Sequence, residues 1–213
     1  MSLGSHADPI AQVSSEELHA PTNTRSDLNL APEIQLTDLQ AYHVGVVFDL
    51  FQGKGTRGKL VDAFSEDAVY EDLFASCKNR EEVAGQLLNL PLLLSSAKTN
   101  SHLITSISRT TTSTHARPSI PADEIAIKFN HTFTFKAPLP DKMSSVTMDT
   151  TLMVYSAEGE GKIVRLQDRP DEKIPNNGFI NIIRKMNAVG VPKIVSMPKD
   201  DKEDAESVLK HQR

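Results

Sequence analysis

Hydrophobic residues recur along this chain at two spacings, and the change between them separates the predicted helices from the predicted strands. Between residues 39 and 51 the apolar positions follow three- and four-residue steps, which is typical of a helix buried on most sides. Thr37 and Gln40 precede this stripe at capping-box spacing, so we expect the helix to begin there. Two shorter helices are expected at 60–64 and, after a second cap signature, at about 79–90.

Later in the chain the apolar positions alternate with a period of two, in four runs at 99–109, 124–136, 144–155 and 162–168. Clusters of Pro, Gly and Asp separate these runs, which favours four sequential strands in an antiparallel meander. A brief strand is also expected at 68–72, and a closing helix at 178–187. Three helices followed by four strands indicate an α+β fold class.

The two ends of the chain lack this periodicity. Residues 1–35 mix Ser, Pro, Thr, Asn and Asp with scattered aliphatics, a composition that does not offset the entropy lost on ordering. We therefore expect a disordered arm at 1–35, one domain at 36–198 and a charged flexible tail at 199–213.

Charge and cysteine content exclude several classes of function. Lys and Arg total 23 against 28 Asp and Glu, so the net charge of −5 predicts no attraction for nucleic acid or anionic membrane. The chain has one cysteine, its first residues lack the features of a secretion signal, and no apolar run approaches membrane-spanning length. These features predict a cytoplasmic protein.

Two stretches resemble a known family. Residues 64–74 read FSEDAVYEDLF, residues 79–84 read NREEVA and residues 160–169 read EGKIVRLQDR. They are similar to the first strand, third helix and last strand of SnoaL-like proteins in the nuclear-transport-factor-2-like superfamily, over about residues 37–170. The resemblance implies a cone, in which a curved antiparallel sheet wraps around the N-terminal helices, with a C-terminal helix and a pocket inside.

Asp72 is the first catalytic candidate, because the resemblance aligns Glu71-Asp72 with the general base of the ketosteroid isomerases. A partly desolvated carboxylate at the mouth of the cone would move protons near neutral pH. The structural alternative is that Asp72 caps the strand end through backbone amides. The alignment places Val46 and Thr151 where those isomerases have their oxyanion hole, and Tyr42 and Asp149 replace them only if the register slips.

His131 is the second catalytic candidate, because strict alternation along 124–136 turns its imidazole inward. If the run at 99–109 pairs with this strand about the midpoint of the connection, His102 faces His131. With Asp72 they would form an acid-base set similar to that of the scytalone-type dehydratases. A core histidine satisfied by a polar neighbour is the alternative, and a one-residue slip would turn one ring outward.

Two functional hypotheses follow. The first is that the chain binds a small apolar or aromatic molecule in its pocket, as an isomerase, cyclase or dehydratase that uses no metal or organic cofactor. The second is a non-catalytic module that holds a ligand or forms a homodimer through its sheet face. The residues expected to line the pocket, besides Asp72 and His131, are Tyr42, His43, Val46, Tyr70, Phe74, His102, Phe129 and Thr151.

Overall fold

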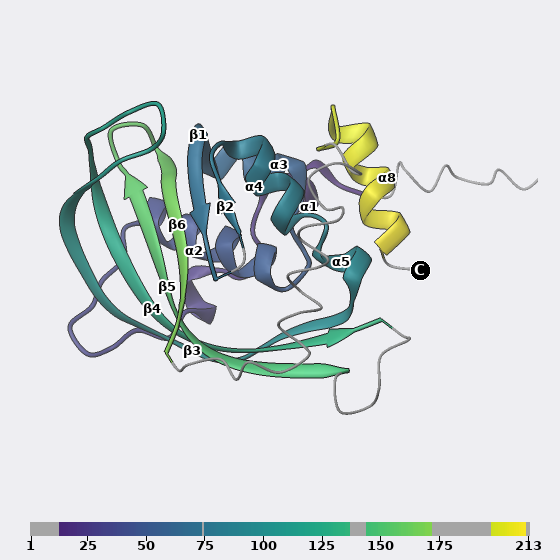
Figure 1. Cartoon of the computed structure of the whole chain (residues 1–213), viewed down its shortest axis with the longest axis horizontal. Helices are drawn as coiled ribbons and strands as arrows, with labels where there is room; N and C mark the ends of the chain where they lie inside the picture. Colours follow the sequence, from purple (N-terminus) through teal and green to yellow (C-terminus); the bar gives the residue numbers. More distant parts are fainter. Residues whose placement is uncertain (1–12, 74, 137–143, 172–196, 212–213) are drawn as a thin grey trace, which may run out of the picture.

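The structure is a computed structural model that describes residues 13–73, 75–136, 144–171 and 197–211. Within these residues the helices gather on one side of a single curved sheet (Figure 1). The helices are α1 Ser15–His19, η2 Arg25–Asp27, α2 Asp38–Phe51, α3 Arg57–Ala63, α4 Arg80–Leu87, α5 Leu90–Leu93 and α8 Asp201–His211. The strands are β1 Phe64–Glu71, β2 Ser76–Cys77, β3 Leu94–Thr112, β4 Ile120–Phe135, β5 Ser145–Ala157 and β6 Lys162–Pro170.

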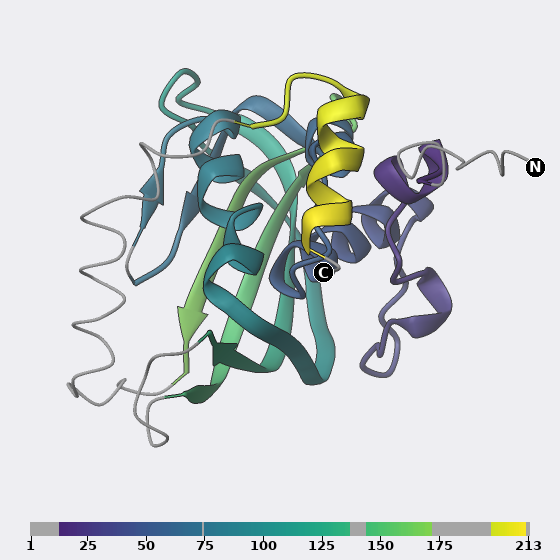
Figure 2. The same ribbon diagram turned by 90° about the vertical axis from the view of Figure 1, so that its right-hand side faces the viewer.

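The described strands form one six-stranded sheet in the order β2-β1-β6-β5-β4-β3. β3 to β6 make the predicted antiparallel meander, whereas β1 pairs with β6 in parallel, which the sequence did not indicate. The β3–β4 ladder shifts register at three places, and such irregularities bend a sheet. Figure 2 shows the result, a sheet that curves around the helices.

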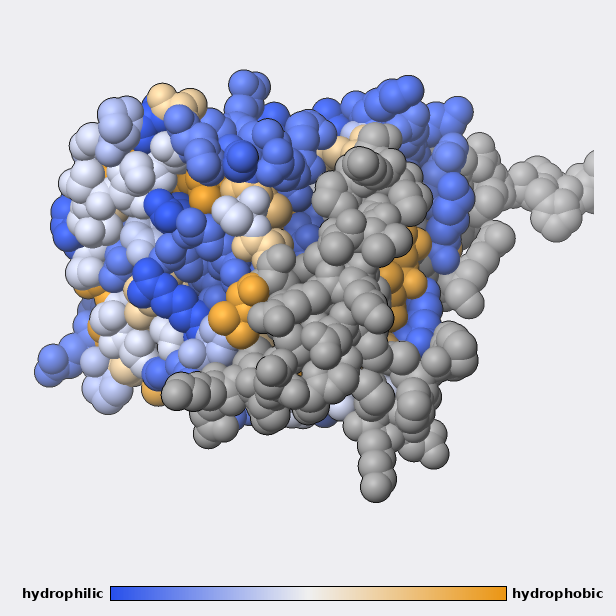
Figure 3. All heavy atoms as spheres, in the orientation of Figure 1, coloured by the Kyte–Doolittle hydropathy of each residue, from blue (hydrophilic) through white to orange (hydrophobic). Residues whose placement is uncertain are grey.

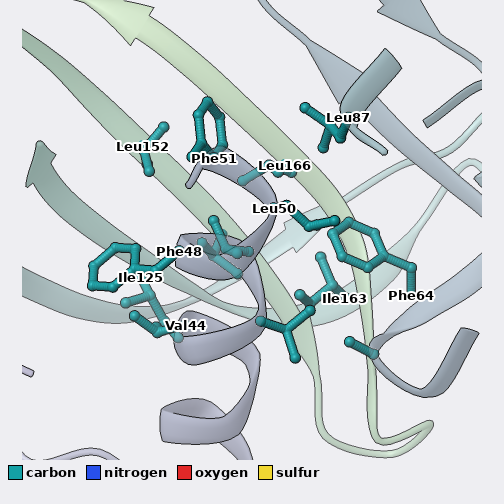
Figure 4. Packing of buried hydrophobic residues seen from close by; sticks show 14 of the residues in the cluster. Val44, Phe48, Leu50, Phe51, Phe64, Leu87, Ile125, Leu152, Ile163 and Leu166 are labelled. Atoms are coloured by element: carbon teal, nitrogen blue, oxygen red, sulfur yellow. The ribbon is translucent and has the colours of Figure 1, made fainter. Parts of the chain in front are cut away.

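Helix α2 lies in the concavity of the sheet and begins where the sequence predicts. The Thr37 hydroxyl accepts the Gln40 amide at 3.1 Å, and the Gln40 side chain accepts the Thr37 amide at 2.9 Å, so the capping box is complete. Its apolar stripe packs onto the strands (Figure 4). The core there is formed by Val44, Phe48, Leu50, Phe51, Phe64, Leu87, Ile125, Leu152, Ile163 and Leu166.

The N-terminal segment differs from the predicted disordered arm, because residues 13–35 pack against the domain. Leu18 and Leu28 are 3% and 7% exposed. The Ala31 amide donates to the Ile104 carbonyl and the Ile104 amide to the Asn29 carbonyl, each at 2.9 Å, which ties the segment to β3. Contacts with residues distant in the sequence therefore fix this segment on the domain, and composition does not reveal such contacts. Residues 1–12 lie outside the described residues.

The C-terminal segment also differs from its predicted description as a flexible tail. Residues 201–211 form α8, and its Asp204 accepts the backbone amides of Arg57 and Gly58 at 2.9 and 3.0 Å. Asp204 and Ala205 are 2% and 3% exposed, so one face of α8 is buried against the domain. The predicted closing helix at 178–187 lies outside the described residues. None of the described helices has the length and hydrophobicity needed to cross a membrane.

Candidate functional site

A pocket of about 100 Å³ lies at one end of the concavity, between α4, α5 and the strands. Aromatic and aliphatic side chains make up most of its wall, with two carboxyl groups and one amide among them. The lining residues are Phe51, Tyr70, Asp72, Leu73, Gln86, Leu87, Leu90, Leu93, Leu94, Phe133, Phe135, Met148, Asp168 and Pro170. Apolar pockets with a few polar groups are the usual form of small-molecule sites, although most are larger than this one.

Asp72 lies just beyond the end of β1 and makes the contacts of the structural alternative. The Tyr70 hydroxyl donates to its Oδ2 at 2.7 Å, and the Ala75 amide donates to its Oδ1 at 2.6 Å. These bonds close the turn between β1 and β2. The side chain is nevertheless only partly buried, and it lines the pocket.

Asp168 is a second carboxyl group in the pocket, and the sequence interpretation missed it. It pairs with Leu152 across β5 and β6, and its Oδ1 is enclosed without a hydrogen-bond partner among the described residues. Burial raises the pKa of Asp168 to about 7, the nearby Thr150 hydroxyl opposes this rise, and the Asp72 and Asp171 charges add to it. This carboxyl group therefore changes its protonation state near neutral pH.

The sequence held a signal for Asp168. Leu166 is an apolar core residue of β6, and alternation places Asp168 on the same inward face two positions later. The cation available at this strand end, Lys128, pairs with Asp171 instead, at 3.0 Å from its Nζ. Asp168 is thereby left without a basic partner in the part of the chain that the structure describes.

His131 points inward, as alternation predicts, but it does not line the pocket. Its ring stacks on Phe129 at 5.1 Å and meets Phe133, a wall residue, edge to face at 4.1 Å. The side chain is 2% exposed, burial lowers its pKa to about 4, and neither ring nitrogen has a hydrogen-bond partner among the described residues. A neutral imidazole therefore lies one ring behind the pocket wall.

The predicted pairing of His102 with His131 is wrong. Thr99 faces His131 and His102 faces Phe129, because the strands pair one residue away from the assumed register at the hairpin and the register shifts again between Ile104 and Ser106. His102 instead accepts the Asn29 amide at 2.9 Å and packs edge to face on a phenylalanine of α2. Its hydrogen-bonding capacity serves the N-terminal segment rather than the pocket.

Most of the other residues expected to line the pocket lie elsewhere. Tyr70 lines it, whereas Val46 and Phe129 are buried in the core. His43 is buried against the Ser156 hydroxyl at 2.9 Å, and burial lowers its pKa to about 4. The Tyr42 hydroxyl donates to the His19 carbonyl at 3.4 Å. Phe74 lies outside the described residues.

The predicted position of Thr151 is wrong by one residue. Thr151 lies on the outer face of the sheet, where it donates to Asp171, and Asp149 is also outside, bonded to Asn130. Thr150 points inward instead, at 3% exposure, and its hydroxyl has no hydrogen-bond partner among the described residues. Successive residues of a strand face opposite sides of the sheet, so an alignment error of one residue exchanges an inward-facing side chain for an outward-facing one.

The outer face of the sheet is polar over its described residues. Hydrogen bonds join Asn100 to Asn130 at 2.7 Å and Thr132 to Thr147 at 2.7 Å, and the surface over the strands is mostly hydrophilic or neutral in Figure 3. The large hydrophobic residues exposed within the described ranges are Leu73, Leu92 and Leu103. The contiguous apolar patch that a dimer through this face would use is not found there.

Metal chemistry also lacks a site in the described ranges, where no three His, Cys, Asp or Glu side chains gather in a geometry that would hold an ion. No protein-family model matches the sequence, and no curated protein matches it.

Several solved structures share the arrangement of elements at low similarity. An NTF2-like protein of unknown function from Exiguobacterium sp. 255-15 is 16% identical, with 62% of this chain and 99% of that chain covered and a TM-score of 0.42. A putative SnoaL-like polyketide cyclase from Shewanella putrefaciens CN-32 is 12% identical, with coverage of 80% and 93% and a TM-score of 0.43. A hypothetical protein with a ketosteroid isomerase-like fold from Catenulispora acidiphila, in complex with trimethylamine, is 15% identical, with coverage of 59% and 82% and a TM-score of 0.42.

These descriptions agree with the predicted resemblance to SnoaL-like proteins of the NTF2-like superfamily. At TM-scores below 0.5 the fold assignment rests on the chain's own sheet order and helix placement, and no ligand or activity is carried over to this chain.

Proposed function

We propose that this chain binds a small molecule in the pocket between α4, α5 and the sheet, and that Asp168 exchanges a proton with it. The observation that carries the proposal is the Asp168 carboxyl group, which lines an apolar pocket and has a pKa raised to about 7 by burial. A group that titrates near the working pH is suited to both accept and donate a proton. Strongly perturbed groups in a cleft are also more frequent at functional sites than elsewhere.

Asp72 and Tyr70 complete the proposed site. Tyr70 donates to Asp72 at 2.7 Å, so the Asp72 carboxylate stays oriented at the mouth of the pocket and adds negative charge beside Asp168. In the proposed reaction the Asp168 carboxylate takes a proton from a C–H or O–H bond of the ligand and returns it at another atom. Isomerases, cyclases and dehydratases all use such a transfer. Because His131 lies behind the pocket wall, Asp168 rather than a histidine acts as the general acid and base in this proposal.

The test uses Met148, which lines the pocket, as a reporter. We would label methionine methyl groups with ¹³C and screen neutral, cationic and anionic compounds of up to about eight heavy atoms by NMR. Met153, which belongs to a separate apolar cluster, serves as the internal control. Ligands are expected to shift the Met148 methyl signal and leave the Met153 signal in place. If no compound shifts Met148 in the folded protein, the binding proposal is wrong.

Ligands that bind and carry an exchangeable C–H bond are then incubated in D₂O. The wild-type protein should accelerate deuterium incorporation, and Asp168→Asn should slow it by about 10² to 10⁴ fold, the usual contribution of general acid-base catalysis. Asp149→Asn is the matched control, because Asp149 lies on the outer face of the sheet and is bonded to Asn130. Binding without any exchange would support the alternative, a non-catalytic ligand-binding module.

A further inference from the structure

The pocket is unfavourable for anions. Two carboxyl groups, Asp72 and Asp168, line it, and no lysine or arginine is among its described lining residues. The charge of Asp72 already helps to hold the proton on Asp168, which shows that negative charge is in excess there. An added carboxylate or phosphate would increase this repulsion, whereas a cation would relieve it.

One group in the pocket wall has an unused hydrogen-bond acceptor. Asp168 Oδ1 is enclosed without a hydrogen-bond partner among the described residues, as are two groups that do not line the pocket, the Thr150 hydroxyl and the His131 ring nitrogens behind the wall. Thr150 and His131 are 3% and 2% exposed. Buried polar groups in folded proteins are nearly always paired, so an unpaired carboxyl oxygen in the wall of a pocket points to a ligand group that pairs with it. In its ionised form the carboxylate only accepts, so its partner in that form must be a donor.

The rest of the wall suits the body of a small organic cation. The rings of Phe51, Tyr70, Phe133 and Phe135 line the pocket, and aromatic faces attract ammonium groups. The volume of about 100 Å³ is smaller than the cavity of about 150 Å³ that holds benzene in an engineered protein. A ligand with few heavy atoms is therefore expected.

We infer that the pocket takes a small amine in its protonated form, with its N–H donors toward Asp168 and its apolar body against the aromatic rings. This inference rests on the proposed function, because it names the ligand class of the same pocket. It does not depend on whether the bound molecule is then converted.

The experiment compares three compounds that share a tert-butyl body and differ in charge: tert-butylammonium, tert-butanol and pivalate. Each is titrated into the full chain with ¹³C-labelled methionine methyl groups, with Met148 as the reporter. tert-Butylammonium is expected to bind at least about tenfold more tightly than the other two. Its Kd should also rise about tenfold from pH 8 to pH 6, because the ionised fraction of Asp168 falls by that factor around a pKa of about 7.

Two variants separate the charge from the shape of the pocket. Asp168→Asn should weaken tert-butylammonium by tenfold or more, remove its pH dependence and leave tert-butanol unchanged. Thr150→Val keeps the side-chain volume and removes the hydroxyl that lowers the pKa of Asp168, so it should weaken only the ammonium compound, by a few fold. Asp149→Asn, on the outer face of the sheet, should change neither compound.

The possible outcomes are distinguishable. If tert-butanol or pivalate shifts Met148 at equal or lower concentration than tert-butylammonium, the charge inference is wrong and the pocket proposal stands. If none of the three compounds, nor any member of the wider screen, shifts Met148 in the folded protein, both proposals are wrong. Equal binding of tert-butylammonium to Asp168→Asn and wild type would also overturn the inference.

Discussion

Replacement of Asp168 by asparagine is expected to stabilise the protein above neutral pH, although the residue lies in the proposed site. Asparagine has nearly the same shape and carries no charge, so it removes the burial of a carboxylate without leaving a cavity. Functional sites often hold groups that lower the stability of the folded protein, and the destabilising effect of Asp168 should be measurable.

The size of the effect follows from the two pKa values of the carboxyl group. Its ordinary pKa is 3.8, and burial raises it to about 7 in the native protein. Because the native state holds the proton more tightly, the native carboxyl costs no stability below pH 3.8, an increasing amount up to pH 7 and a constant amount above it. Each pH unit corresponds to about 1.36 kcal/mol, so the upper limit is roughly 4 kcal/mol. Since the side chain keeps some contact with the pocket's solvent, we expect a gain of about 2 kcal/mol or more.

The assay is urea denaturation of wild type and Asp168→Asn at pH 5 and pH 8. The free energy of unfolding of the variant should exceed that of wild type by about 2 to 4 kcal/mol at pH 8, and by roughly a third of that at pH 5, where the carboxyl group is protonated in the native state but still ionised in the unfolded state. Asp67→Asn is the control with the opposite sign. Arg117 lowers the pKa of Asp67, so its loss should destabilise the protein at neutral pH, and this difference should vanish as pH falls below the ordinary pKa of the carboxyl group.

The reasoning would be refuted by a variant that is less stable than wild type by the same amount at both pH values. Such a result would mean that Asp168 accepts hydrogen bonds that asparagine cannot replace, and that its carboxylate is not strained by burial. A ¹³C NMR titration of the carboxyl group is an independent check, with a midpoint expected near pH 7 rather than near 4.

Three further predictions concern the core and the N-terminal segment. His131→Phe should raise the free energy of unfolding more at pH 5 than at pH 8, because the native imidazole pKa of about 4 lies below its ordinary 6.5 and wild type loses stability as pH falls between them; equal effects at both pH values would contradict this. Lys59→Met should cost about 3 to 5 kcal/mol in urea denaturation, because it leaves the buried Asp49 carboxylate without its cation at 2.8 Å, and adding Asp49→Asn should recover part of the loss; simple additivity of the two changes would argue against the pair. Leu18→Ala should cost about 2 to 4 kcal/mol, whereas Leu92→Ala, at 47% exposure, should cost less than about 0.5 kcal/mol; similar values for the two would show that the N-terminal segment is not docked.

Features set by local sequence were predictable. Thr37 and Gln40 satisfy amides within one turn, and Asn79 does the same for Glu82 at 2.9 Å, so both helix starts appear in the sequence as short-range spacings. The four runs of period two likewise became β3 to β6, because alternation reflects a sheet with one face on the core.

Features set by distant partners were not predictable from the same patterns. In the sequence, Leu18 and Leu28 follow no periodic pattern. In the structure they are buried, because residues 15–31 pack against the helices and β3. Asp204 reads as one charge in an acidic tail, but it accepts two amides at the start of α3. Composition averages over such residues, so it assigned disorder to segments in which a few long-range contacts determine the structure.

The candidate site lies between these two cases. Alternation places Asp168 inward, but whether an inward aspartate is paired or isolated depends on which of its neighbours takes the available cation, and here Asp171 takes Lys128. The register of β3 against β4 likewise decides whether His102 meets His131, and the hairpin register together with the irregularity between Ile104 and Ser106 places His102 two residues away, opposite Phe129. Protonation behaviour therefore follows from the pairing of the strands rather than from the presence of histidine and aspartate in the sequence. The carboxyl group left without a cation by that pairing is the one whose pKa moves to the pH at which a proton can be exchanged.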